Sequence, residues 1–138
     1  MKENYEIEDL DINDVEELEK KFDTYDENYI TYKIDGNISI GVKNNGYLIA
    51  GVDACMTSFK ILYVSTVFVD EKYRRKGLGK MLMEEVERRA IGLGANMIRL
   101  DTFNWQGREF YLSLGYEQVG EYNNAIDGFS EHFFLKRL

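Results

Sequence analysis

The spacing of apolar residues changes abruptly in the middle of the chain, and this change constrains the fold more than any other feature of the sequence. Residues 61–69 are rich in β-branched and aromatic side chains, which are typical of a central strand. From Leu78 to Ala90 apolar residues lie four positions apart, with Glu and Arg pairs on the other side, which predicts a long amphipathic helix. Gly77 and Gly79 lie at the junction. The sequence therefore predicts a strand that leads through a glycine loop directly into a helix.

The segments before this junction predict four elements and a loop. Ile7 and Leu10 indicate a short strand, and Asn13 is the expected cap of a helix with apolar residues at three- and four-residue spacing. Asp23–Thr31 is expected to be a loop or a short second helix. Two apolar runs around the turn at 44–46 then predict a β-hairpin.

The segments after the junction predict three strands and one helix. The strands are expected at 97–102, 116–122 and 131–138, and the helix at 105–114, where Gly115 ends it. Together with the upstream elements they describe one mixed α/β sheet with helices on its faces. A length of 138 residues is that of a single domain.

The net charge of −8 is unevenly distributed along the chain. Residues 1–31 contain twelve acids and three bases, a balance of −9, so residues 32–138 carry +1. Five of the bases lie within nine positions around the two glycines: Lys72, Arg74, Arg75, Lys76 and Lys80. The acidic total argues against a nucleic-acid partner, whereas the local basic cluster indicates a small anionic ligand.

The loop between the strand and the helix has the composition of a phosphate-binding site. At a helix start the backbone N–H groups lack partners within the helix, and the helix dipole favours a negative charge. Glycines allow close approach, and basic side chains add charge-assisted hydrogen bonds. The pattern GxGxxG fails because Leu82 stands at its third glycine, and the Walker pattern fails at Arg74 and Met81. The loop therefore indicates a ligand with phosphates, but neither NAD nor ATP.

Other classes of protein are disfavoured by what the sequence lacks. No apolar run approaches the roughly 20 residues of a membrane span, and the N-terminus is acidic, unlike a secretory signal. A single cysteine, Cys55, forms no internal disulfide, so we expect a cytoplasmic protein with no membrane partner. No His/Cys cluster is present, so no metal is expected, and the lone histidine, His132, is interpreted as a packing or surface residue.

Two segments resemble motifs of the GNAT superfamily of N-acetyltransferases. Residues 74–79 read Arg-x-x-Gly-x-Gly, which resembles the family's acetyl-CoA pyrophosphate loop, and residues 67–73 resemble the strand and turn before it. Asn104 and the segment 110–116, with seven residues from Asn104 to Tyr111, resemble a second family motif. The resemblance runs from about residue 61 to the C-terminus. It implies a single-domain GNAT-like α/β fold whose mixed, mostly antiparallel sheet has six or seven strands and helices on both faces.

The resemblance also implies that acetyl-CoA is the co-substrate. Its pyrophosphate would lie in the glycine loop and its pantetheine arm along the preceding strand. The residues implied in binding it are Val67, Phe68, Val69, Arg74, Arg75, Lys76, Gly77, Leu78, Gly79, Lys80 and Asn104. The domain of residues 1–138 would divide into an acceptor-side half, 1–60, and an acetyl-CoA-binding half, 61–138.

Catalysis in this family is a direct attack of a neutral primary amine on the thioester. Tyr111 stands where the family has a general acid for the departing thiolate. The alternative for Tyr111 is an aromatic side chain that only fills the core. Asp101 is the leading candidate for the base, with Asp53 and Tyr63 as further candidates, and its alternative is a solvated carboxylate at a strand end.

Several questions stay open at the level of sequence. The acceptor is a small-molecule or peptide amine. The acids Asp23, Asp26 and Glu27 are hypothesised to attract a cationic acceptor, although a solvated helix face is the favoured explanation of the acidic segment. A non-catalytic acyl-CoA-binding or sensing module is the main alternative function, and a nucleotide-binding regulatory domain is a third. The oligomeric state, monomer or homodimer, is also open.

Overall fold

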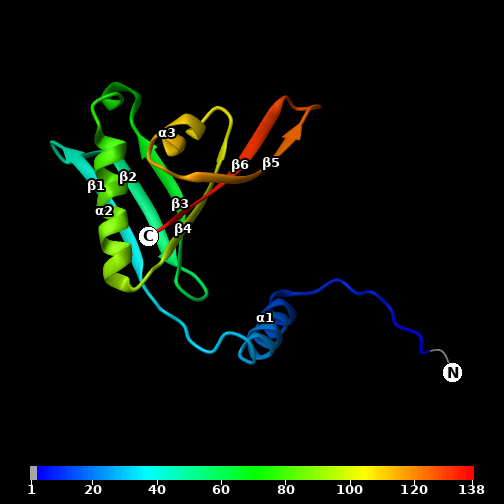
Figure 1. The fold of residues 1–138 in the computed structure, drawn as a ribbon. Coiled ribbons are helices and arrows are strands. Elements are labelled where there is room, and N and C mark those ends of the chain that lie inside the picture. The colour runs from blue at the N-terminus through cyan, green and yellow to red at the C-terminus, as the bar shows by residue number, and fades with distance from the viewer. Residues whose placement is uncertain (1–2) are drawn as a thin grey trace. The chain divides into compact units, whose positions relative to one another are not determined.

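The computed structural model describes residues 3–138, and the chain separates into two compact units, Met1–Tyr32 and Lys33–Leu138. The first unit holds the helix α1 (Ile12–Asp26), and the second holds the sheet and the other helices (Figure 1). The expected division at residue 60 is functional, lies inside the second unit, and remains a prediction.

The helix α1 begins with a capping box. The carboxylate of Asp11 accepts a hydrogen bond from the Asp14 N–H at 2.9 Å, and the Asp14 carboxylate accepts one from the Asp11 N–H at 3.2 Å. These two bonds satisfy backbone donors that a helix start leaves without partners. The cap is therefore Asp11, and the prediction of Asn13 was wrong by two residues.

The segment before α1 also differs from the prediction. Ile7 and Leu10 are exposed and, within the described chain, take part in no β-bridge, so the expected first strand is absent. A strand needs a partner for its backbone hydrogen bonds, and apolar residues alone do not supply one. For residues 23–31, the helix α1 continues to Asp26 and a turn at 27–29 follows, so after Asp26 the loop is confirmed of the two alternatives.

The second unit is built on one six-stranded sheet with the strand order β1-β2-β3-β4-β6-β5. The strands are β1 (Asn37–Asn44), β2 (Tyr47–Met56), β3 (Ile61–Val69), β4 (Met97–Phe103), β5 (Glu117–Asn124) and β6 (Phe129–Arg137). The pair β3–β4 is parallel and the other four pairs are antiparallel, so the predicted mixed, mostly antiparallel sheet is confirmed. The predicted hairpin is β1–β2, whose turn residues Asn45 and Gly46 both have positive φ, as a type I′ turn requires.

Both helices of this unit pack on the same face of the sheet. The helix α2 (Leu78–Leu93) connects the parallel strands β3 and β4, and α3 (Arg108–Ser113) follows β4. Leu82 and Val86 of α2 and Tyr111 of α3 belong to one core cluster with buried residues of β1 to β4 and β6. The expected helices on both faces are therefore not found within residues 33–138. No helix in residues 3–138 is both long enough and apolar enough to span a membrane.

The helix α3 begins three residues later than the predicted start at residue 105. Residues 104–107 form a turn in which the Gln106 side chain accepts a hydrogen bond from the Phe103 N–H at 2.8 Å. The hydroxyl of Thr102 accepts one from the Gly107 N–H at 3.1 Å. These side-chain bonds hold the backbone in a turn, which competes with helix formation there.

The strands β3 and β4 pair over only three residues each. Residues 61–63 lie beside 97–99, and beyond Tyr63 and Arg99 the two strands are no longer paired. Figure 1 shows them separating toward the end of the sheet that carries α3. On its other edge β3 contains a bulge, because Ser65 is skipped between the pairs Asp53–Thr66 and Ala54–Val64. A bulge bends and twists its strand, which promotes this separation.

A substitution of Leu62, in the paired part of β3, tests how much core packing at this strand contributes to the free energy of unfolding. Its side chain is 0% exposed, so Leu62→Ala removes buried methyl groups and leaves a cavity. We expect the free energy of unfolding to fall by about 2–5 kcal/mol in urea titrations. The control Leu48→Ala removes the same atoms from a side chain that is 67% exposed and should change it by no more than about 0.5 kcal/mol. Equal losses in the two variants would show that β3 is not part of the central core.

Candidate active site

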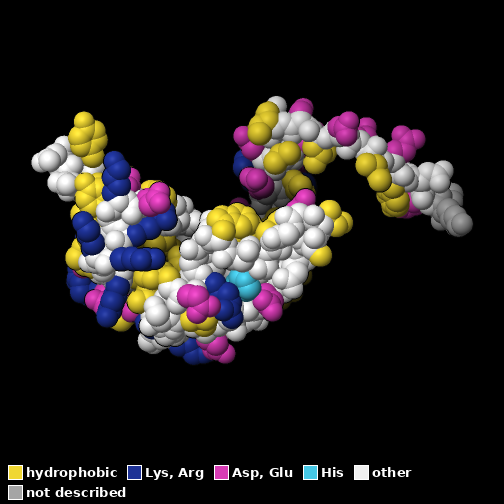
Figure 2. All heavy atoms as spheres, turned by 90° about the horizontal axis from the view of Figure 1, so that it is seen from above, with side chains coloured by type: hydrophobic (Ala, Val, Ile, Leu, Met, Phe, Trp, Pro, Cys, Tyr) yellow, Lys and Arg dark blue, Asp and Glu magenta, His cyan; other side chains and the backbone are white. Residues whose placement is uncertain are grey.

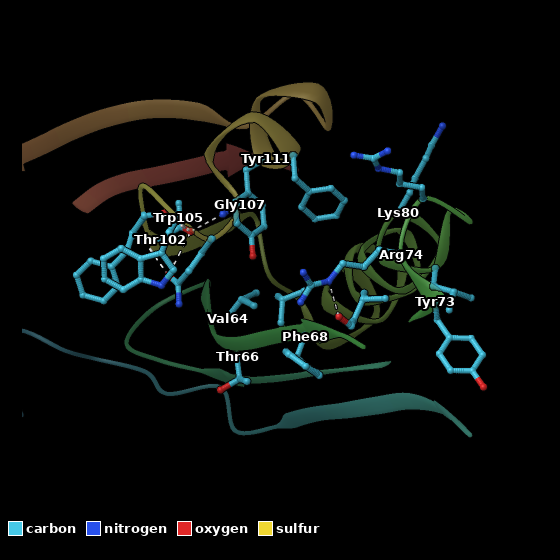
Figure 3. Close-up of a pocket in the computed structure, with 18 of the residues that line it drawn as sticks. Val64, Thr66, Phe68, Tyr73, Arg74, Lys80, Thr102, Trp105, Gly107 and Tyr111 are labelled. Atoms are coloured by element: carbon cyan, nitrogen blue, oxygen red, sulfur yellow. Dashed lines mark hydrogen bonds between the residues drawn. The ribbon is translucent and has the colours of Figure 1, made fainter. Parts of the chain in front are cut away.

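A pocket of about 970 Å³ lies where β3 and β4 separate. Its walls come from β3, the loop after it, the start of α2, the end of β4 and the following turn, and α3 (Figure 3). Eleven of the thirteen site residues expected from the sequence line it: Val67, Phe68, Val69, Arg74, Arg75, Gly77, Leu78, Gly79, Lys80, Asp101 and Tyr111. The segments that the sequence singled out thus converge on one cavity.

One wall of the pocket is a strand edge. Because β3 pairs with β4 only through Tyr63, the edge from Val64 to Val69 faces the pocket with no neighbouring strand. One carbonyl on this strand, that of Val69, accepts a hydrogen bond from Nε of Arg74 at 2.8 Å, and the Arg74 guanidinium lies 5.9 Å from the Phe68 ring centre. An extended ligand could form backbone hydrogen bonds along such an edge.

The glycine loop forms a second wall with an exposed helix start. Gly77 is the N-cap of α2 in the left-handed conformation, with φ of 79°, and no side chain caps the helix. The first helical bond runs from the Met81 N–H to the Gly77 carbonyl at 3.0 Å, so the amides of residues 78–80 have no acceptor within the helix. No atom lies within 4 Å of where a Gly77 Cβ would stand. This cradle suits a phosphate group.

Basic side chains surround this cradle. Arg74, Arg75 and Lys80 line the pocket, and Figure 2, which views this end of the sheet, shows Lys and Arg side chains around an apolar hollow. Lys76 does not line the pocket; its Nζ lies 5.4 Å from the Tyr73 ring centre. The combination of free amides and positive charge makes this end of the pocket a site for a polyanion.

Asn104 also lies outside the pocket lining. Its side-chain oxygen accepts a hydrogen bond from the Ser130 N–H at 3.1 Å, and its own N–H donates to the Ser130 carbonyl at 2.9 Å. These bonds attach the turn after β4 to the start of β6. In this structure Asn104 therefore positions the turn that forms one end of the pocket.

Tyr111 belongs both to the core and to the pocket. Its side chain is 7% exposed, and its ring contacts those of Phe110, Tyr116 and Phe134 at centroid distances of 5.2, 5.8 and 6.0 Å. Figure 3 shows its hydroxyl pointing into the cavity. Burial, and secondly the negative charge of Asp101, raise the pKa of Tyr111 to about 12. The phenol is therefore held in its protonated form at the centre of the pocket.

Asp101 lies at the end of β4, on the border of the pocket. Its Oδ2 accepts a hydrogen bond from the Tyr63 hydroxyl at 3.2 Å. Burial and the charge of Asp101 raise the pKa of Tyr63, so this phenol stays protonated and donates to the carboxylate. Asp53, the third candidate base, does not line the pocket and accepts a hydrogen bond from the Ser39 hydroxyl at 2.6 Å.

Comparison with known proteins agrees with this geometry. A model of the acetyltransferase (GNAT) family matches residues 3–116. An acetyltransferase from Bacillus cereus is 33% identical, with 97% of this chain and 98% of that one covered and a TM-score of 0.90. The chain belongs to the GNAT acetyltransferase family. The resemblance drawn from residues 74–79 and 104–116 is thereby confirmed.

Two further relatives show how far the similarity extends. A stretch of 58 residues, 42% of this chain, is 34% identical to an L-ornithine N5-acetyltransferase of Arabidopsis thaliana, and it spans only 24% of that protein. The PaiA N-acetyltransferase of Thermoplasma acidophilum, solved in complex with coenzyme A, shares the fold with a TM-score of 0.63 at 16% identity, over 87% of this chain and 70% of that one.

Sequence reasoning missed the pocket residues at the end of β4 and in the turn that follows it. Thr102, Trp105 and Gln106 line the pocket there, and the side chains of Thr102 and Gln106 form the hydrogen bonds that stabilise the turn at residues 104–107. The available signal was Thr102, a polar residue at a buried position of a strand. His132, by contrast, is buried outside the pocket and bonds Ser130 through Nε2 at 2.9 Å, which fits its interpretation as a packing residue.

Gly77 and Gly92, both in or beside α2, give a matched test of the loop conformation. Gly77→Ala introduces a Cβ at positive φ, where strain alone should lower the free energy of unfolding by about 1–2 kcal/mol because no neighbour obstructs the new atom. Gly92→Ala, in the last turn of α2 with open space around it and no positive φ, should raise it by up to about 0.5–1 kcal/mol. Urea unfolding of both variants measures the difference. A Gly77→Ala variant as stable as wild type would contradict the left-handed loop.

Proposed function

We propose that the chain transfers the acetyl group of acetyl-CoA directly to a primary amine. The observation that carries this proposal is the position of the Tyr111 hydroxyl, which opens into the same pocket that the glycine loop and the free edge of β3 enclose. Membership of the GNAT family and the coenzyme A complex of PaiA support the choice of donor. The named activity of the Arabidopsis relative supports an amine acceptor.

The residues of the pocket fit the parts of acetyl-CoA. The amides of residues 78–80, with Arg75 and Lys80, suit the pyrophosphate, and the unpaired edge of β3 suits the amide-containing arm. The lack of any atom near the Gly77 Cβ position leaves room for phosphate oxygens. When bound, acetyl-CoA supplies a thioester whose carbonyl carbon is open to attack and whose sulfur leaves as a thiolate.

Tyr111 stabilises the leaving group. With a pKa near 12, it remains protonated through the whole neutral and alkaline range in which an amine acts as a nucleophile. A thiol has a pKa of about 8.5, so complete transfer from Tyr111 is uphill by roughly 3.5 pKa units. Tyr111 therefore acts by donating a strong hydrogen bond that stabilises charge on the departing sulfur, and the proton lost by the amine balances the reaction.

Asp101 provides the acceptor for the amine proton. A primary amine with a pKa of about 10.4 is almost entirely protonated at neutral pH, so a base must remove one proton before or during the attack. Asp101 borders the pocket, and its negative charge acts on Tyr111. The Tyr63 hydrogen bond orients the carboxylate, which accepts the proton directly or through a water molecule.

Replacing Tyr111 by phenylalanine tests its role as hydrogen-bond donor to the departing sulfur. Tyr111→Phe keeps the ring in the core and removes only the hydroxyl, so we expect kcat to fall by about 10²-fold or more while the Kd for acetyl-CoA changes little. Tyr116→Phe is the matched control, since this neighbouring buried phenol bonds Glu87 and does not line the pocket. Thiol release from acetyl-CoA with an amine panel measures both. Unchanged turnover in Tyr111→Phe would remove this residue from the mechanism.

Reversing the charge of Lys80 tests the polyanion site. A charge-assisted hydrogen bond contributes about 1.5–3 kcal/mol, so Lys80→Glu should weaken acetyl-CoA binding at least about tenfold in calorimetric titrations. Lys60→Glu makes the same charge change just before β3, at the opposite end of that strand, and should bind normally. Tight binding without turnover of any amine would instead favour a sensing module.

A further inference from the structure

The face of the sheet opposite α2 and α3 carries two carboxylates beside the pocket. The strand register sets Asp101 of β4 across from Phe133 of β6, and Phe103 across from Glu131. Asp101 and Glu131 are therefore diagonal neighbours on one face, at a backbone separation of about 7–8 Å. Glu131 in turn lies across from Tyr122 of β5.

Each of these carboxylates accepts a hydrogen bond from its own phenol. The Tyr63 hydroxyl donates to Asp101 at 3.2 Å, and the Tyr122 hydroxyl donates to Glu131 at 2.5 Å. The pKa of Tyr63 is raised chiefly by burial, then by Asp101, with a smaller contribution from the charge of Glu131. The pKa of Tyr122 is raised chiefly by its hydrogen bond to Glu131, with a smaller contribution from the charge of Asp101. The four side chains thus form one electrostatically continuous group.

An arginine beside this group does not neutralise it. Arg99 stacks on Tyr63, with its guanidinium 4.3 Å from the ring centre, and it lies two residues before Asp101 on β4. One guanidinium against two carboxylates leaves a net negative charge at the border of the pocket, where a cation is favoured.

Aromatic rings form a wall beside the two carboxylates. The rings of Phe103 and Trp105 stack in parallel at 4.7 Å, and Phe129 meets both edge-on at 5.5 and 6.1 Å. Tyr122 lies 6.5 Å from Phe129 and completes the wall. Trp105 is nevertheless 65% exposed, so its ring is accessible to a ligand. Aromatic faces beside carboxylates are a favourable environment for an organic ammonium group.

This surface is continuous with the reaction centre. Asp101, Phe103 and Trp105 line the same pocket as Tyr111. The Tyr111 side chain is more than nine-tenths buried, and its hydroxyl points into that pocket and forms no hydrogen bond with any residue in 3–138. A phenol hydroxyl that opens into a pocket without a protein partner is available to bond a ligand atom there.

We propose that this acidic aromatic face, made of Tyr63, Asp101, Glu131 and the aromatic wall of Phe103, Trp105, Tyr122 and Phe129, binds the acceptor and selects amines that carry a second positive charge. The inference rests on the proposed acetyl transfer. The reacting nitrogen lies at Asp101, and the second cation lies between Glu131 and the aromatic wall. The backbone separation of about 7–8 Å suits two amino groups joined by about four or five methylenes. The favoured acceptors are therefore small aliphatic diamines and their longer homologues.

A comparison of matched amines tests this proposal. We expect wild type to acetylate 1,4-diaminobutane with a kcat/KM at least about tenfold above that for butylamine, which has the same chain and one amino group. In Glu131→Gln this preference should fall close to one, chiefly through a higher KM for the diamine. The control Glu121→Gln removes a carboxylate from the same hairpin, but Glu121 lies across from His132 on the opposite face and its variant should keep the full preference.

The single tryptophan offers a measurement that does not depend on turnover. Trp105 belongs to the wall, so titration with 1,4-diaminobutane should change its fluorescence saturably, and Glu131→Gln should raise the Kd at least about tenfold. Butylamine should produce a much weaker response. A loss of binding that is equal for the two amines would mean that Glu131 acts only structurally, and the proposal would be wrong.

The outcomes separate this inference from the proposed function. If monoamines or peptide N-termini are acetylated as well as the diamine, acetyl transfer stands and selection of a second cation is overturned. If acetyl-CoA binds and no amine in the panel is acetylated, the proposed function fails. In that case saturable diamine binding that depends on Glu131 would still support the acidic aromatic face as a cation site.

Discussion

The incomplete pairing of β3 with β4 is the constraint on which the rest of the molecule depends. Three residues of each strand form a parallel ladder, and the strands then diverge. Parallel neighbours need a crossover connection, and α2 supplies it, so the helix whose start faces the pocket also joins the two strands that enclose it. The divergence leaves the edge of β3 without a neighbour and places Asp101 and Tyr111 around the same cavity.

Hydrogen bonds and core packing among β6, α2 and α3 stabilise the region where β3 and β4 diverge. Lys136 of β6 donates hydrogen bonds to Glu87 of α2 and to the Leu114 carbonyl at the end of α3, both at 2.9 Å. One side chain thus connects the last strand with both helices. Tyr111 and Phe134 fill the space beneath, so the core on this face remains closed although the two strands above it have separated.

The sequence was sufficient for features that depend on local periodicity and turn chemistry. The strand at 61–69, the hairpin turn at Asn45 and Gly46 and the helix from Leu78 were predicted correctly. The strand around Ile7 was wrong because a strand exists only through a partner, which its own residues do not specify. The start of α3 was wrong because the Gln106 side chain holds a turn with Phe103, a bond that no propensity indicates.

Some residues of the candidate site could likewise be predicted from the sequence, and others could not. The glycine loop and Tyr111 were found from motifs because their spacing along the chain carries the signal. The pairing of Asp101 with Tyr63 and the proximity of Glu131 were not accessible, because they depend on the register between strands that are distant in sequence. Which residues oppose one another across a sheet is a property of the assembled fold.

The hydrogen bond between Arg74 and the Val69 carbonyl has a consequence for where affinity can come from. A backbone carbonyl has two lone pairs, so a ligand N–H can bond this oxygen beside the guanidinium without displacing it. The bond uses only Nε of Arg74, and the other N–H groups of the guanidinium are left to contact an anion. One arginine can therefore hold the end of the strand edge and contribute to anion binding at the same time, so the two sources of affinity do not compete.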